Sequence, residues 1–133
     1  FEPYSASYKD RIKSLKYLNK KGLKTWISME PYPTPNLIQQ DLHKILREIS
    51  FVDKIIFGKL NYNVKSSQFS ANRDFYYNCA KIVIEFCKNK GIEYHIKYGT
   101  QGKDNRKTEK IFVKNFIEDL SLKEKQHTLF ISK

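Results

Sequence analysis

Charged and polar side chains stand where the predicted strands of this 133-residue chain end. Parallel α/β barrels place their binding and catalytic groups at the carboxyl ends of the strands. These strand-end residues are Glu2, Glu30, Lys59, Asn61 and Lys97. Carboxylate, ammonium and amide groups at one edge of a sheet favour binding of a polar ligand through charge and hydrogen bonds.

Glu30 is the strongest candidate of the five. It ends the apolar segment 23–30 (LKTWISME), and Pro31 follows it, so its carboxylate is expected at the mouth of a barrel. There it would accept hydrogen bonds from a ribose or an amino group. Capping of a loop, or pairing with a nearby lysine, is an equally good interpretation. Glu2 follows the same logic more weakly, and we expect it to order its turn by pairing with Arg11.

Lys59 and Asn61 open the polar segment 58–69, which follows the short apolar run 54–57. Such a run is typical of a strand that is buried on both faces. A solvated polar loop is the favoured interpretation of the segment that follows, which also contains Asn63. A ligand-binding loop at the end of the strand is the alternative.

The three histidines predict no metal site, because they are scattered without the spacing of metal ligands. His43 and His127 are expected at the surface. His95 belongs to the segment 92–97 (IEYHIK), where apolar and polar residues alternate and predict an edge strand with one wet face. A catalytic role for His95 is an alternative to a surface position.

The two cysteines, Cys79 and Cys87, lie about two helical turns apart, roughly 12 Å, which is too far for a disulfide. We expect both in the core. Their reduced state weakly favours a cytoplasmic location. No apolar run is long enough to span a bilayer.

Helices and strands alternate along the chain. Apolar residues at helical spacing predict helices over 7–21, 36–49 and about 70–90, and the strands between them are 23–30, 54–57 and 92–97. Ser7 with Asp10 and Asn36 with Gln39 form capping pairs at two of the helix starts.

Gly22 and Gly91 each follow a cationic last helical turn and precede a strand. The 69 residues between them (91 − 22) leave room for two βα units. The alternation therefore predicts an α/β fold of parallel strands joined by right-handed crossovers. Beyond residue 98 we expect a charged loop over 99–110, a helix over 111–120 and a last strand over 128–132.

The formal net charge is +11, from 25 Lys and Arg against 14 Asp and Glu. Such a charge favours polyanions through counterion release. The positive residues are mostly lysines spread over helix faces, so a lysine-rich composition without a binding role is the favoured interpretation.

One stretch carries the resemblance to a known family. Glu2-Pro3 ends a strand, Ser7 caps a helix that carries Arg11, Ile12 and Leu18 and ends at Gly22, and the segment 25–31 (TWISMEP) with Pro33 follows. This layout resembles radical-SAM proteins of the spore photoproduct lyase-like group. The match covers about a quarter of the chain.

The resemblance implies that the chain is the C-terminal half of a larger protein. Residues 1–98 would be the fourth to sixth units of a partial (β/α)6 TIM-type barrel, and residues 99–133 a C-terminal α/β extension. The family cleaves S-adenosylmethionine reductively with an electron from a 4Fe–4S cluster. The resemblance places Glu30, Lys59, Asn61 and Glu2 nearest to the cofactor.

The chain departs from the family in one respect. The family holds its cluster with three cysteines spaced C-x₃-C-x₂-C, and no such triplet exists here. Iron–sulfur clusters require thiolate ligands, so this chain is expected to bind no cluster and to be inactive alone.

The expected partner is the missing N-terminal half of the barrel. The exposed strand edges of a half barrel also predict a homodimer that mimics a closed barrel. The alternative function is a small basic α/β module that binds nucleic acid, with the aromatic residues and the lysine-rich loop 99–110 in contact with it.

Overall fold

A computed structural model describes residues 4–101 of the chain. Its elements in chain order are α1 (Tyr8–Lys20), β1 (Trp26–Tyr32), α2 (Leu42–Glu48), β2 (Lys54–Lys59), α3 (Val64–Gln68), α4 (Asn72–Lys90) and β3 (Glu93–Ile96). The three strands form a parallel sheet in the order β1-β2-β3. The predicted α/β class with parallel strands is therefore confirmed.

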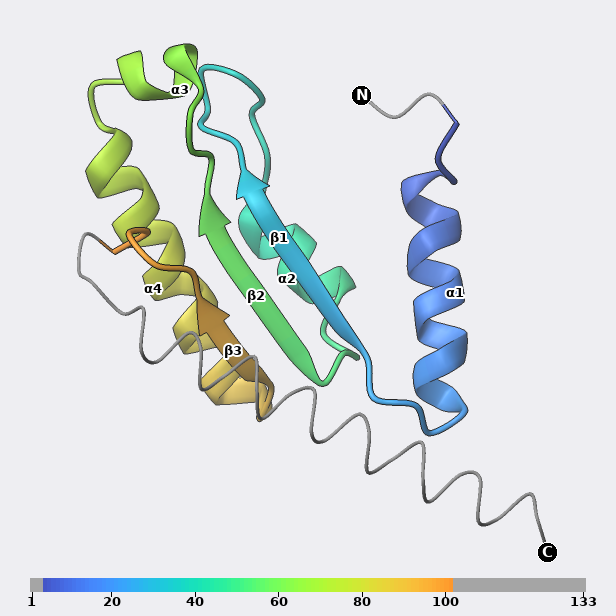
Figure 1. Cartoon of the computed structure of the whole chain (residues 1–133). Coiled ribbons are helices and arrows are strands. Elements are labelled where there is room, and N and C mark those ends of the chain that lie inside the picture. The colour runs from blue at the N-terminus through green and yellow to red at the C-terminus, as the bar shows by residue number, and fades with distance from the viewer. Residues whose placement is uncertain (1–3, 102–133) are drawn as a thin grey trace, which may run out of the picture.

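The helices α2 and α4 form one layer behind the sheet, and the core lies between the two layers (Figure 1). The central strand β2 is buried on both faces, as its apolar run predicts. Ile55 and Phe57 on β2 pack against Leu46 of α2 and Val83 of α4. None of these four side chains is accessible to solvent.

The parallel register divides the side chains of the sheet between two faces. Ile55 pairs with Ile27 on one side and with Tyr94 on the other; Ile55 belongs to the core beneath the helices, and Ile27 and Tyr94 pack against it. Because successive side chains alternate, the residues between them point to the opposite face. We call this the second face; it carries Trp26, Ser28 and Glu30 of β1, Lys54, Ile56 and Gly58 of β2, and Glu93, His95 and Lys97 on or next to β3.

The helices α1 and α4 match the sequence closely. The Ser7 hydroxyl caps α1 by accepting from the backbone N–H of Asp10 at 3.2 Å, as the capping pair predicts. Gly22 and Gly91 follow α1 and α4 with positive φ angles. Cys79 and Cys87 are free and buried on α4, which confirms that they belong to the core. No helix within residues 4–101 is long and apolar enough to cross a membrane.

The second helix begins at Leu42, so the predicted start at Asn36 is wrong. Asp41 is the actual N-cap, and its carboxylate accepts from the N–H of Lys44 at 3.0 Å. Asn36 instead lies in a turn closed on the carbonyl of Thr34. Its side-chain amide donates to the carbonyl of Lys65 at 2.8 Å, so it fastens this turn to α3.

The segment 58–69 is not a simple polar loop. Gly58 and Lys59 extend β2, and Val64–Gln68 form the short helix α3. Asn63 caps α3, because its side-chain oxygen accepts from the N–H of Ser66 at 2.9 Å. Five residues of helix carry too little periodicity to be visible in the sequence.

Candidate functional site

The carboxyl ends of the three strands lie at the same edge of the sheet, as expected for parallel strands. Glu30 stands near the end of β1, Gly58 near the end of β2, and Lys97 directly after β3. The backbone N–H of Lys97 donates to the carbonyl of Phe57 at 2.8 Å, which continues the ladder between β2 and β3. This hydrogen bond therefore fixes the position of Lys97 along β2, next to Gly58.

Glu30 and Lys97 form an ion pair on the second face, with 3.6 Å between the Glu30 Oε2 and the Lys97 Nζ atoms. Their strands are not neighbours, since β2 lies between them. Strands two positions apart in a sheet are separated by about 10 Å. The two side chains therefore meet by crossing the middle strand.

Gly58 is the residue beneath this crossing. A Cβ atom at position 58 would lie 3.0 Å from the Glu30 Cγ atom, and equally close to the Cβ and Cγ atoms of Lys97. That separation is shorter than ordinary van der Waals contact between carbon atoms, about 3.5–4.0 Å. The missing side chain of Gly58 thus makes the room in which the carboxylate and the ammonium group approach each other.

A tight turn after β3 supports the lysine side of the site. The N–H of Thr100 donates to the carbonyl of Lys97 at 3.1 Å, and Gly99 has a φ of 75°. A type II turn requires positive φ at its third residue, which glycine adopts without steric cost. The buried hydroxyl of Thr100 accepts from the backbone N–H of Lys59 at 3.3 Å. This bond ties the turn to the end of β2.

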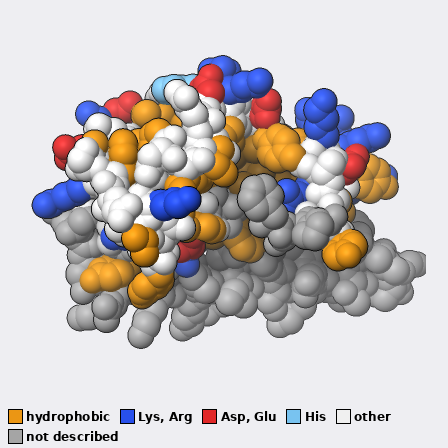
Figure 2. Space-filling model, turned by 90° about the horizontal axis from the view of Figure 1, so that it is seen from above, with side chains coloured by type: hydrophobic (Ala, Val, Ile, Leu, Met, Phe, Trp, Pro, Cys, Tyr) orange, Lys and Arg blue, Asp and Glu red, His pale blue; other side chains and the backbone are white. Residues whose placement is uncertain are grey.

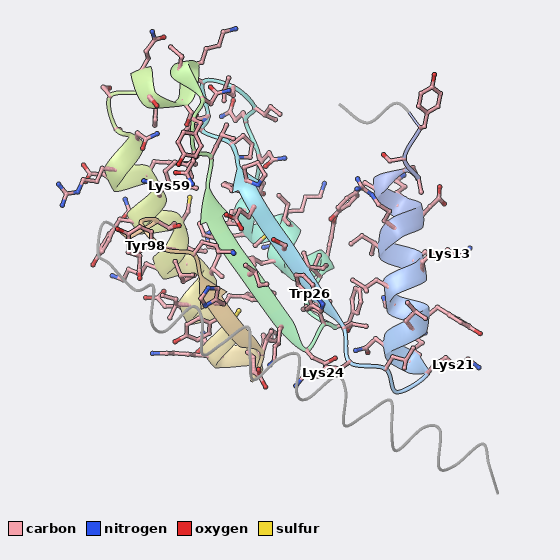
Figure 3. All side chains as sticks on the ribbon, in the orientation of Figure 1. Lys13, Lys21, Lys24, Trp26, Lys59 and Tyr98 are labelled. Atoms are coloured by element: carbon pink, nitrogen blue, oxygen red, sulfur yellow. The ribbon has the colours of Figure 1, made fainter. Side chains whose placement is uncertain are left out.

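Lys59 lies at the same edge of the sheet but not in the crossing. It alternates with Gly58, so its side chain leaves β2 on the side of the helices. Its ammonium nitrogen would lie 3.6 Å from a Cβ atom at Gly99. Figure 3 shows Lys59 and Tyr98 on the β3 side of the sheet, whereas Trp26 lies on the side of α1. Lys59 therefore adds positive charge next to the turn. The residue that pairs with Glu30 is Lys97.

Away from the Glu30–Lys97 pair, the second face is less exposed to solvent than the alternating pattern of residues 92–97 predicts. His95 is only 6% exposed, so the expectation of a surface histidine is wrong. Lys54 is also buried and pairs with Glu93 at the amino end of the sheet. Burial of polar groups beside the middle strand raises the strength of nearby electrostatic interactions, because the local dielectric constant is low.

The Glu30–Lys97 pair is accessible enough to bind a ligand. The side chains are 32% and 30% exposed, respectively. A partly exposed ion pair contributes at most about 1 kcal/mol to stability, so a ligand with better geometry can take over both partners. The carboxylate of Glu30 accepts hydrogen bonds from a cationic amine, and the ammonium of Lys97 donates to a carboxylate or phosphate. A zwitterion satisfies both at once.

The structure brings together only part of the set predicted from the sequence. Glu30 and Lys97 meet, and Lys59 lies beside them at the turn. Asn61 is exposed and follows β2, with no hydrogen bond that joins it to Glu30 or Lys97 among the described residues. Glu2 lies outside the described residues. Gly58 was missed, although an isolated glycine inside a strand pattern is itself a sign of close approach.

The described residues offer no metal site, since no three His, Cys, Asp or Glu side chains gather there. His43 is exposed on α2, as predicted, and His127 lies outside the described residues. Burial raises the pKa of the Cys79 thiol to about 11 and that of the Cys87 thiol to about 11 as well. Metals and clusters bind the thiolate, so these two cysteines are poor ligands.

Comparison of the chain with protein-family models, with curated proteins and with solved structures gives no match.

Proposed function

We propose that the chain forms part of the cofactor pocket of a radical-SAM-type enzyme, with Glu30 and Lys97 as the groups that bind S-adenosylmethionine. The observation that carries the proposal is the ion pair across Gly58 at the carboxyl ends of three parallel strands. The similarity of residues 1–36 to the spore photoproduct lyase-like group supports it. A partial (β/α)6 barrel is the parent fold that we propose.

The methionine part of S-adenosylmethionine is a zwitterion and fits the two side chains. Glu30 would accept hydrogen bonds from its ammonium group, and Lys97 would donate to its carboxylate. Hydrogen bonds between charged partners are stronger than those between neutral ones. The half-buried position strengthens both, because water competes less there than at an open surface. We assign Lys59 and Asn61 to the outer part of the same pocket, towards the adenosine.

The 4Fe–4S cluster of such an enzyme supplies, when bound, the electron that cleaves S-adenosylmethionine. The residues of this chain do not fit the cluster, because the whole sequence has two cysteines and both are buried in the core. The ligands would have to come from the N-terminal half of the barrel, which we propose as the partner of this chain.

A titration of the ¹⁵N-labelled chain with S-adenosylmethionine tests the binding role. We expect shifts of the backbone signals of Gly58, Lys97 and Gly99. Glu30→Gln removes the charge and keeps the shape, and we expect it to weaken binding by about tenfold or more, the equivalent of one charge-assisted hydrogen bond. Glu85→Gln on the exposed side of α4 is the matched control and should leave binding unchanged. Equal affinities of all three proteins would overturn the proposal.

A second assay tests whether the chain is incomplete as an enzyme. The purified chain, incubated with dithionite and S-adenosylmethionine, should release no 5′-deoxyadenosine. The same assay should give 5′-deoxyadenosine when the chain is mixed with a protein that supplies the N-terminal half of the barrel and its C-x₃-C-x₂-C motif. Release of 5′-deoxyadenosine by the chain alone would contradict the proposal that the chain needs the N-terminal half of the barrel for activity.

Binding of nucleic acid is the alternative function, and basic side chains along α1 and α2 favour it. Lys9, Lys13, Lys16, Lys44 and Arg47 line the groove between these helices. On the face that Figure 2 shows, however, Lys and Arg lie at separate places with Asp and Glu between them, not as one continuous patch. A gel shift with single-stranded DNA distinguishes the two functions, because binding that persists near physiological salt would favour the alternative.

We also propose that the isolated chain self-associates through its strand edges, as a half barrel would. Light scattering should show a dimer whose fraction rises with protein concentration. A monomer at every concentration would contradict this.

A further inference from the structure

The helix α1 stands beyond the edge of the sheet, unlike α4. The helix α4 packs on both β2 and β3, and α2 passes behind β1 and β2, whereas α1 lies to the outside of β1 (Figure 1). In a parallel βα repeat each helix covers the seam between two neighbouring strands. The position of α1 therefore corresponds to the seam between β1 and one more strand on its outer side.

The apolar stripe of α1 is less well covered than those of α2 and α4. Those two helices have fully buried residues, whereas α1 has none. Ile12 and Leu15 are only partly buried against the core, and Leu18 is 40% exposed. An amphipathic helix is stabilised mainly by burial of its apolar face. The apolar stripe of α1 therefore still exposes apolar surface to solvent on the side that faces the sheet.

A groove of about 1210 Å³ lies between α1, the outer side of β1 and α2. Ser28 and Met29 of β1 line one side of it, and Ile12 of α1 lines the other. The two helices are joined next to it by the Tyr8 hydroxyl, which donates to the Glu48 carboxylate at 2.9 Å. The groove is therefore bounded by α1, α2 and β1, and β1 runs along its length.

The backbone of β1 presents hydrogen-bonding groups to this groove. The carbonyl of Thr25 accepts from the N–H of Lys54 at 3.3 Å, so Thr25 directs its backbone groups towards β2. Backbone groups alternate between the two sides along a strand, so Ser28 directs both of its groups away from β2 and Glu30 directs its N–H away, before the register shifts between Met29 and Tyr32. Within residues 4–101, β2 is the only strand that pairs with β1.

We infer that this groove binds an extended polypeptide segment, which adds to the sheet as a fourth parallel strand beside β1. A strand of about five to seven residues fills the length of β1. Its apolar side chains would cover Ile12 and Leu15, and acidic side chains at its ends would meet the lysines along the rim. The inference does not depend on the ligand at Glu30, although such a strand would end beside that residue and add a further side chain to the edge.

A synthetic peptide of about eight residues, acetyl-EVTVTIVE-amide, is the probe. Hydrogen exchange of the full chain should slow at the amides of Ser28 and Glu30 when the peptide is added. The amides of β3 should not change. The fluorescence of Trp26, the single tryptophan, should also shift, because it lies on the strand that gains a neighbour.

Two variants at one position make the test specific. Ser28→Pro removes the N–H on the outer side and leaves the ladder with β2 intact, since proline is tolerated on the outer side of edge strands. We expect it to abolish protection by the peptide while the circular dichroism spectrum of the chain is unchanged. Ser28→Ala keeps the N–H and should bind the peptide as the original chain does.

The inference would be overturned by protection confined to the amides of β3, or by equal peptide binding to the Ser28→Pro and Ser28→Ala variants. It would also be overturned if a single-stranded oligonucleotide, and not the peptide, protected Ser28 and Glu30. If titration of the S-adenosylmethionine site fails but the peptide adds to β1, the proposed cofactor is wrong and the strand site stands.

Discussion

The carboxylate of Glu30 and the ammonium group of Lys97 lie 3.6 Å apart above Gly58, although they belong to strands that are not neighbours in the sheet. Each side chain crosses half of the middle strand to reach the other, and a side chain at position 58 would stand between them. The pair therefore marks a place where the sheet leaves space on its second face. A ligand that carries both charges would use the same two groups and the same space.

Gly58→Ala tests the role of this space. The added methyl group would touch Glu30 and Lys97 at 3.0 Å, so both side chains must move. We expect ligand binding to fall more than stability does. The clash costs about 1 kcal/mol or more, and alanine returns part of that cost by restricting the unfolded chain.

Thermal unfolding and the ¹⁵N titration of the Gly58→Ala variant give the two readouts. Gly91→Ala is a suitable control, because it follows α4 and its added Cβ would meet no atom within 4 Å. Its positive φ makes it destabilising without an effect on the site. Unchanged ligand affinity in the Gly58→Ala variant would show that ligand binding does not need the space at Gly58.

Tyr76→Phe tests a buried bridge beneath the site. The Tyr76 hydroxyl donates to the carbonyl of Tyr32 at 2.7 Å and accepts from the N–H of Leu60 at 3.0 Å. Its loss leaves two backbone groups without this partner, which costs about 1–3 kcal/mol. Urea unfolding should show the decrease. Tyr77→Phe, one residue along on the exposed side of α4, should cost almost nothing, and equal losses would contradict the prediction.

Asp53→Ala tests the connection at the amino end of the sheet. The Asp53 carboxylate accepts from the backbone N–H of Thr25 at 2.6 Å and lies 3.3 Å from the Thr25 hydroxyl. Both bonds fix the start of β1 against the start of β2. We expect the variant to lose about 1–3 kcal/mol of unfolding free energy and the amide of Thr25 to exchange faster. Asp53→Asn, which retains an acceptor oxygen, should lose less.

The buried thiols predict a loss of stability at alkaline pH. Burial raises the pKa of Cys79 from 9.0 to about 11, and Cys87 behaves in the same way. Between these values the unfolded chain has released protons that the folded chain still holds, so the unfolding free energy falls as pH rises. Tyr32, whose pKa burial raises to about 12, extends the same trend. Urea unfolding at pH 8, 9, 10 and 11 measures it, and a flat profile would be contrary to the prediction.

Thiol reactivity gives an independent check of the same burial. At pH 8 Ellman's reagent should react slowly with the folded chain, because neither cysteine is exposed or ionised. In denaturant both should react at once. Rapid reaction of one cysteine in the folded chain would show that α4 is less well packed than the structure has it.

The sequence predicted the elements whose signals are local and repeated. The helix α4 has nineteen residues with a regular apolar stripe and a final glycine, so its type and its bounds followed directly. The strand β2 followed from its uninterrupted apolar run. The start of α2 did not, because Asn36 and Asp41 are both residue types that cap helices; in the structure Asp41 is the cap, and the Asn36 amide donates to the carbonyl of Lys65 on α3, 29 residues away.

The site was predictable in its members but not in its geometry. The rule that groups gather at strand ends selected Glu30, Lys59 and Lys97. It did not show that Lys59 points to the helix side while Lys97 reaches across Gly58, because this depends on the register between three strands. The burial of His95 was missed for a similar reason, since alternation along one strand does not reveal what packs on each face.

The most direct test of the central claim compares ligands that differ in charge at the two groups that Glu30 and Lys97 would bind. Isothermal titration of the chain with S-adenosylmethionine, its decarboxylated form and 5′-methylthioadenosine gives the affinity of each. The account predicts that loss of the ligand carboxylate weakens binding by about tenfold and that Lys97→Gln abolishes this difference. Equal affinities for the three ligands, unaffected by Lys97→Gln, would contradict it.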